Sequence, residues 1–105
     1  IAKSILINDT DSIIEKNAIC AFENPALECQ LKEKGVTRLF IAGLLTNVCV
    51  ASTVRAAYDK GFEVFTISDA MGTIDPAMQS SSLEIEFPLF SKPILSKDFK
   101  SHLDL

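Results

Sequence analysis

The sequence predicts an α/β fold with a mostly parallel sheet and helices on its faces. Short apolar segments alternate along the chain with segments of helical periodicity. The central apolar segments, residues 39–42 and 62–67, are continuous rather than alternating, as expected for strands that helices cover on both faces. Strands connected through helices in this order pair in parallel with right-handed crossovers. A chain of 105 residues builds one core, so we expect a single domain over residues 1–105.

The N-terminal part of the chain predicts two short strands. Residues 1–7 form an apolar run, and residues 12–16 form a second run after a polar turn. Residues 17–22 are expected to be irregular or extended. Because the chain starts with Ile1 rather than Met and enters an apolar run at once, we expect a domain truncated at its N-terminus.

Two helices have clear start and end signals. Asn24 can cap a helix that has Pro25 at its first position, where the missing N–H costs nothing. Gly35 ends this helix because glycine adopts the left-handed conformation easily. A second helix is expected from about residue 47 to residue 60, with Gly61 after it.

The C-terminal third predicts a loop, a helix and a strand. Residues 68–73 are expected to form a loop after the preceding strand. The Asp-Pro pair at 75–76 repeats the capping signal, and the helix that it starts should end before Pro88, since the position before a proline disfavours helix. A last strand is expected at residues 93–96, and residues 99–105 form a short amphipathic tail.

Composition excludes several classes of function. The net charge is −4 and no run of Lys or Arg is present, which argues against nucleic-acid binding. No apolar run reaches the length of a membrane span. The three cysteines are an odd number without close pairing, which favours free thiols in a reducing, cytoplasmic compartment. With a single histidine and no ligand spacing for zinc, we expect no metal and no cofactor.

Residues 39–50 organise the candidate site. This stretch begins as a buried strand, breaks at Gly43 and enters a helix near Thr46, which places Cys49 in the first helical turn. Ligands of α/β sheets bind beyond the carboxyl ends of the strands, and a helix N-terminus favours a thiolate. Cys49 is therefore the first candidate nucleophile. The alternative is an ordinary buried cysteine that packs the helix on the sheet.

Three segments carry a family resemblance. Residues 43–50 (GLLTNVCV) resemble the signature of the isochorismatase-like cysteine hydrolases, which include nicotinamidases and N-carbamoylsarcosine amidohydrolases. Residues 16–22 (KNAICAF) resemble the lysine segment of that family, which usually ends Ser-Ala-Phe. The Asp-Ala pair at 69–70 resembles a pair that recurs after the next strand. The matches fall in the family's order over nearly the whole chain.

The resemblance implies a Rossmann-like three-layer sandwich, here as a partial domain, and a triad of Cys, Lys and Asp. Cys49 matches the nucleophile and Lys16 the lysine. A cis peptide bond between Leu44 and Leu45 is implied, with the backbone N–H groups of Leu45 and Cys49 as an oxyanion hole. The implied substrate is a small amide or carbamoyl compound, because hydrolysis of a vinyl ether does not need this cysteine. The family also implies a homo-oligomer.

Two positions depart from the family pattern. The family's aspartate comes from a strand far upstream of the lysine, whereas Asp9 lies too close to Lys16 in sequence and the region of Asp11 matches the turn before the lysine. We therefore expect the catalytic aspartate to be missing from this chain. Cys20 stands where the family usually has serine.

Several alternatives stay open at this point. One alternative makes Lys16 a solvated lysine at a strand end. Another makes Leu44 and Leu45 core residues in a trans connection. Asp69 is as well suited to capping a turn as to binding a ligand. Cys20 and Cys29 are expected to be structural, and His102 is expected to be solvated and inert. At the level of function, the alternatives are a catalytically silent remnant that acts as an assembly subunit and, more weakly, a nucleotide-binding module, for which no glycine-rich loop is present.

Overall fold

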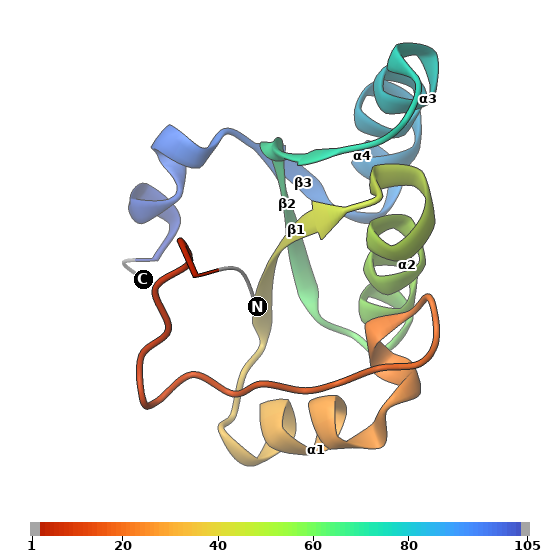
Figure 1. The fold of residues 1–105 in the computed structure, drawn as a ribbon. Coiled ribbons are helices and arrows are strands. Elements are labelled where there is room, and N and C mark those ends of the chain that lie inside the picture. The colour runs from red at the N-terminus through yellow and green to blue at the C-terminus, as the bar shows by residue number, and fades with distance from the viewer. Residues whose placement is uncertain (1–2, 104–105) are drawn as a thin grey trace.

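The computed structural model describes residues 3–103 and shows a parallel three-stranded sheet (Figure 1). The strands are β1 (Arg38–Leu44), β2 (Glu63–Gly72) and β3 (Lys92–Ile94), and they lie in the order β1-β2-β3. Both pairings are parallel, with Arg38 opposite Glu63 at the start of the register. The predicted α/β fold with a parallel sheet is confirmed.

Helices α2, α3 and α4 lie on one face of the sheet, and α1 lies below the end at which β1 begins (Figure 1). Helix α2 (Ala51–Asp59) connects β1 to β2, while α3 (Pro76–Ser81) and α4 (Phe87–Phe90) connect β2 to β3 through a π-helical turn, Ser82–Glu86. Helix α1 (Pro25–Glu33) follows a 3₁₀ turn and precedes β1. The described residues thus form the sheet and one helical layer of the expected three-layer sandwich.

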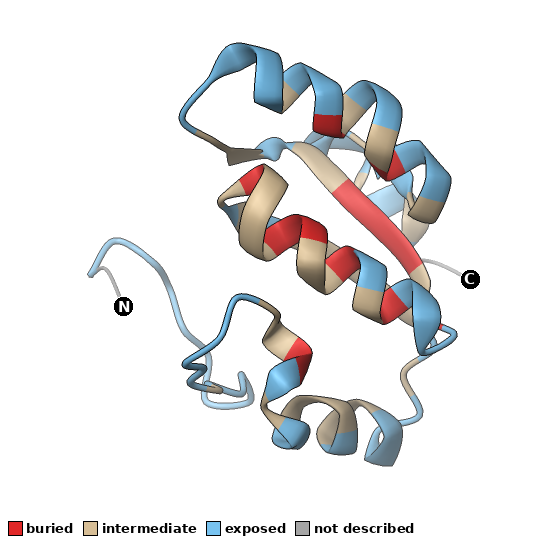
Figure 2. Cartoon of the chain, turned by 90° about the vertical axis from the view of Figure 1, so that its right-hand side faces the viewer, coloured by how far each residue is buried: buried red, intermediate tan, exposed pale blue. Residues whose placement is uncertain are grey.

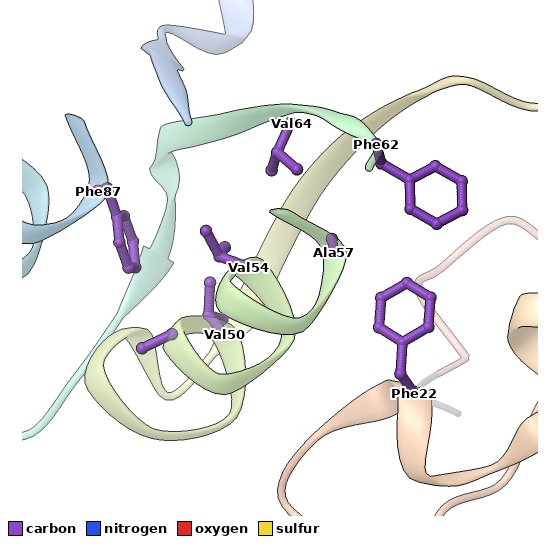
Figure 3. Packing of buried hydrophobic residues seen from close by; sticks show 8 residues of the cluster. Phe22, Val50, Val54, Ala57, Phe62, Val64 and Phe87 are labelled. Carbon is purple, nitrogen blue, oxygen red and sulfur yellow. The ribbon is translucent and has the colours of Figure 1, made fainter. Parts of the chain in front are cut away.

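The hydrophobic core lies between α2 and the sheet, and Figure 2 shows the buried positions along α2 and β2. Val54, Ala57 and Phe87 are completely buried at its centre, where Val54 and Phe87 bring α2 and α4 together (Figure 3). At the other end of the cluster the ring of Phe22 stacks on that of Phe62, with 6.0 Å between the centroids. This contact packs the segment before α1 against the residues that connect α2 to β2.

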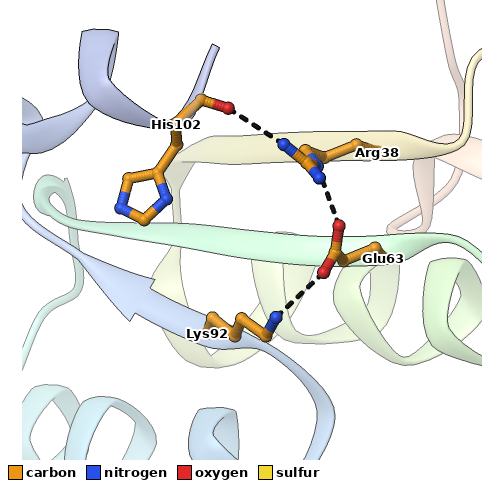
Figure 4. Close-up of polar contacts among 4 residues, drawn as sticks. All are labelled: Arg38, Glu63, Lys92 and His102. Carbon is orange, nitrogen blue, oxygen red and sulfur yellow. Dashed lines mark hydrogen bonds and ion pairs between the residues drawn. The ribbon is translucent and has the colours of Figure 1, made fainter. Parts of the chain in front are cut away.

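The opposite face of the sheet carries an aromatic layer. The ring of Phe40 stacks on that of Phe65 at 4.8 Å and meets Phe99 edge-on at 4.9 Å. His102 lies 5.0 Å from the ring of Phe65, and its backbone oxygen accepts a hydrogen bond from Arg38 (Figure 4). The expectation that His102 is solvated was wrong, because the C-terminal turns fold back over this face.

The two strands expected near the N-terminus are absent from the described part of the chain. Residues 3–20 form turns and extended coil, and residues 1–2 of the first predicted strand lie outside the described residues. Backbone pairing defines a strand, and β1 pairs with β2 on one side without a second neighbour among residues 3–103. Ile5, Leu6 and Ile7, expected in the first strand, are 59%, 93% and 45% exposed.

The helix signals were correct at their starts. The Asn24 side chain accepts a hydrogen bond from the N–H of Ala26 at 3.0 Å, and that of Asp75 accepts one from the N–H of Ala77 at 2.7 Å. Gly35 ends its helix with a φ of 67°. The helix expected over 47–60 is present, and its first turn, Thr46–Val50, is π-helical.

Two expectations in the C-terminal third were wrong. The segment 68–73 is not a loop, because β2 continues to Gly72 and pairs with the end of β1 after a register shift between Ile41 and Gly43. The third helical segment does not end before Pro88. The π-helical turn ends at Glu86, and Pro88 falls in the first turn of α4, where a missing N–H is tolerated.

Candidate active site

Cys49 lies at the carboxyl edge of the sheet, where β1 passes into a helix. Gly43 has a φ of 132°, which favours glycine, and the peptide bond between Leu44 and Leu45 is cis, as the resemblance implied. The chain then enters the π-helical turn Thr46–Val50, in which Cys49 is half-buried. The strand-to-helix transition predicted from the sequence therefore places this thiol in the first helical turn.

Lys16 reaches this thiol from the N-terminal coil. Its ammonium donates hydrogen bonds to the backbone oxygens of Ala18 at 2.8 Å and Ile19 at 3.3 Å. The same nitrogen lies 3.8 Å from the sulfur of Cys49. The coil thus bends around its own lysine, and two candidate side chains separated by 33 positions meet.

Hydrogen bonds to α2 and to the coil hold the lysine segment in place. The N–H of Ala21 donates to the hydroxyl of Thr53 at 3.0 Å, and the thiol of Cys20 donates to the backbone oxygen of Ser52 at 3.7 Å. On the N-terminal side, the Asn24 amide donates to the backbone oxygen of Glu15 at 2.8 Å. Thr53 is one helical turn after Cys49, so the hydrogen bond from Ala21 orients the lysine segment relative to the thiol. The sequence alone did not predict this role for Thr53.

On its other flank, the first helical turn is tied to the segment after β2. The hydroxyl of Thr73 donates to the Asn47 side-chain oxygen at 2.6 Å, and the Gln79 amide donates to the backbone oxygen of Met71 at 3.1 Å. Thr46 is completely buried, and its hydroxyl has no hydrogen-bond partner among the described residues. Thr46 and Asn47 belong to the motif at residues 43–50, but the motif predicted no individual function for them.

The carboxylates of the described chain do not reach Lys16. Within residues 3–103, no Asp or Glu forms an ion pair with its ammonium. Asp11 instead accepts a hydrogen bond from the N–H of Asn8 at 2.9 Å, which closes a local turn. In the same range no three His, Cys, Asp or Glu side chains come together in an arrangement that could hold a metal ion.

Asp69 anchors the C-terminal turns. Its carboxylate accepts hydrogen bonds from the hydroxyl of Ser96 at 2.7 Å and from the N–H of Ser96 at 2.8 Å. Both hydrogen bonds hold the pKa of Asp69 below its ordinary value, and the one from the Ser96 hydroxyl has the larger effect. Of the two interpretations of this residue, the geometry favours the structural one.

The other two cysteines differ from Cys49 in their surroundings. All three thiols are free, and Cys20 is half-buried while Cys29 is exposed on α1. The sulfur of Cys29 lies 3.5 Å from a carboxylate oxygen of Glu33. That hydrogen bond and the negative charge of Glu33 raise the pKa of the Cys29 thiol. Cys29 is therefore an internal reference for a thiol next to an anion, whereas Cys49 is next to a cation.

The sequence matches one protein family over nearly its whole length. The model of the isochorismatase domain matches residues 2–98. The chain belongs to the isochorismatase family. Nicotinamidase 3 of Arabidopsis thaliana is 34% identical over 73% of this chain and 39% of its own length. A ureidoacrylate amidohydrolase of Methylorubrum extorquens is 32% identical over 70% of this chain and 30% of its own length.

Solved structures of the family contain the same architecture. An isochorismatase family protein from Burkholderia thailandensis aligns with a TM-score of 0.89 and 29% identity over 94% of this chain and 52% of that one. The YcaC gene product of Escherichia coli, an octameric hydrolase of unknown specificity, aligns with a TM-score of 0.68 and 27% identity over 83% of this chain and 47% of that one. The chain thus spans about half the length of these structures. None of the helices formed by residues 3–103 is long and apolar enough to cross a membrane.

Proposed function

We propose that this chain carries the nucleophile and its activating lysine in a cysteine-dependent hydrolase of small amide or carbamoyl C–N bonds. The observation that supports this most is the distance of 3.8 Å between the Lys16 ammonium and the Cys49 sulfur. A neighbouring cation and a helix N-terminus both favour the thiolate, which is the nucleophilic form of cysteine. The family membership and the motif around Cys49 support the same function.

In the proposed reaction, the Cys49 thiolate attacks the carbonyl carbon of the substrate. The backbone N–H groups of Leu45 and Cys49 stabilise the resulting oxyanion, and losing one such donor typically costs about 3 kcal/mol of barrier. The C–N bond then breaks, the leaving nitrogen takes up a proton, and a thioester remains on Cys49. Water attacks the thioester carbonyl and releases the acid and the thiol.

Proton transfer in this scheme requires a general base close to the thiol. We propose that the aspartate expected from the family resemblance is not one of the residues of this chain. The absence of an ion pair between Lys16 and any carboxylate of residues 3–103 is consistent with this proposal. It also supports the second candidate, in which the chain is a catalytically silent remnant with an assembly role.

Two relatives, a nicotinamidase and a ureidoacrylate amidohydrolase, support a small amide or ureido substrate by the activities that their names state. The octameric assembly of the YcaC gene product supports self-association of this chain. We further propose a cytoplasmic location, because the three free thiols suit a reducing compartment.

The reactivity of the three thiols tests the proposal. The folded chain is alkylated at a series of pH values between 5 and 9, and mass spectrometry quantifies modification of Cys20, Cys29 and Cys49 separately. We expect Cys49 to react fastest at the acidic end of the series. A Cys49 that reacts no faster than Cys29 contradicts the hydrolase proposal and leaves the assembly role as the better explanation.

A further inference from the structure

A groove lies between α2 and the helical arm, which we define as residues 76–90. It encloses about 630 Å³. Arg55 of α2 lines one wall, and Met78, Ser82, Ile85 and Leu89 of the helical arm line the other. Asn47 lines the end of the groove next to the turn that carries Cys49, but neither Cys49 nor Lys16 lines it, so the groove lies beside the candidate active site rather than within it.

The helical arm presents large apolar side chains beside this groove. Met78, Ile85 and Leu89 are 44%, 68% and 69% exposed, although each is large enough to fill a core position. Tyr58, from α2, is 51% exposed and packs edge-on against Phe90 with 5.5 Å between the ring centroids. Contiguous exposed apolar residues of this kind mark a surface that another molecule covers.

The charges of this region are divided between the two walls. Residues 61–91 contain no Lys or Arg, so the helical arm is apolar and acidic. Across the groove Arg55 forms an ion pair with Glu86 and lies over the ring of Phe90, 5.4 Å from its centroid. Its side chain is nevertheless 56% exposed. A guanidinium has five N–H donors, so Arg55 can bind a second carboxylate while it keeps Glu86.

We propose that this groove is an interface between two copies of the chain, which deepens the self-association proposed above. In a two-fold symmetric contact each copy contributes the same surface, so the surface must carry both a projection and the recess that receives it. Ile85 and Leu89 are the projection and the groove is the recess. In the proposed contact Glu86 of each copy lies near Arg55 of the other, and the two-fold axis makes this pairing reciprocal, so the charges are complementary. An apolar centre with aromatic and Arg residues and without Lys is also the usual composition of such interfaces.

Sedimentation velocity from 5 to 200 µM tests the proposal on the whole chain. We expect the wild type to form dimers or larger assemblies, and Leu89→Glu and Ile85→Glu to weaken association at least tenfold. Ile13→Glu is the matched control, because Ile13 is 63% exposed and lies in the N-terminal coil instead. Circular dichroism shows whether each variant is folded. A monomeric wild type at 200 µM overturns the proposal without reference to any variant.

Charge exchange distinguishes a second copy from other occupants. Arg55→Glu and Glu86→Arg should each weaken self-association, while an equimolar mixture of the two variants should restore it, because both intermolecular pairs are then of opposite charge. Failure of the mixture to associate more strongly than either variant alone overturns the two-fold arrangement. Association that survives in Leu89→Glu and Ile85→Glu, or that disappears in Ile13→Glu, places the contact elsewhere and also overturns it.

The alkylation rate of Cys49 is measured in the same samples. It reports on the proposed catalytic chemistry and does not depend on the helical arm. A slow Cys49 in a chain that dimerises as described contradicts the hydrolase proposal alone, and a fast Cys49 in a monomeric chain contradicts the interface alone.

Discussion

Replacing Lys16 tests the electrostatic part of the proposed mechanism. Its ammonium lies 3.8 Å from the Cys49 sulfur, and the lysine side chain is exposed to water. At that separation two unit charges in a water-like dielectric attract by about 1 kcal/mol, which corresponds to a roughly sixfold change in a rate that depends on this attraction. Because iodoacetamide reacts with the thiolate, Lys16→Ala should slow alkylation of Cys49 about sixfold at acidic to neutral pH.

The assay is the pseudo-first-order rate of Cys49 modification, divided by the rate of Cys29 in the same sample. Lys16→Arg should keep most of the wild-type ratio, and Lys34→Ala, which removes a different exposed lysine, should leave it unchanged. In about 1 M salt the difference between wild type and Lys16→Ala should shrink, since the Debye length falls to about 3 Å. An unchanged ratio in Lys16→Ala refutes the role assigned to this lysine, as does an equal loss in Lys34→Ala.

Three further predictions concern the core and the charged groups. Phe87→Ala should lower the free energy of unfolding by about 3–5 kcal/mol in urea denaturation, because the side chain is completely buried, whereas Leu6→Ala, at a position 93% exposed, should change it by less than about 0.5 kcal/mol. Glu33→Gln should lower the pKa of the Cys29 thiol toward its ordinary value, which a pH series of alkylation rates measures. Hydrogen bonds from Lys92, which has the largest effect, and from Arg38 hold the pKa of Glu63 below its ordinary value. The contribution of Glu63 to stability is therefore complete above the pKa of the unfolded carboxyl and is lost as the pH falls through the folded pKa. Thermal unfolding of Glu63→Gln should therefore depend less on pH between 7 and 3 than that of the wild type; an equal dependence would exclude this contribution.

Local signals in the sequence predicted local structure well. The caps at Asn24 and Asp75 depend on contacts within three residues, so the identity of the capping residue is sufficient to predict them. The continuous apolar segment that became β1 was also predictable from its composition without alternation, although its residues are half-buried or exposed rather than covered on both faces. The placement of Cys49 in the first helical turn follows from this apolar segment, the break at Gly43 and the helix entry near Thr46.

Features that depend on distant partners were not predictable in the same way. The run around Ile13 has the composition of a strand, but a strand also needs a neighbour, and none pairs with it among the described residues. Pro88 breaks a continuous α-helix, yet here a π-helical turn precedes it and moves it to the start of a new segment. The role of Asp69 depends on Ser96, which lies 27 positions later in the chain. The approach of Lys16 to Cys49 came from the family resemblance, since no local pattern connects these residues.

Trapping of the covalent intermediate tests the central claim most directly. The chain is incubated with nicotinamide and with a ureido compound, quenched in acid, and examined by intact-mass and peptide mass spectrometry while released ammonia is measured. We predict an acyl adduct on Cys49 that hydroxylamine removes, with ammonia released in proportion to the adduct; Cys49→Ser should abolish both. Because the general base is proposed to lie outside this chain, no repeated turnover is expected. An adduct on Cys20 or Cys29 instead, or ammonia release that persists in Cys49→Ser, would contradict the assignment of Cys49 as the nucleophile.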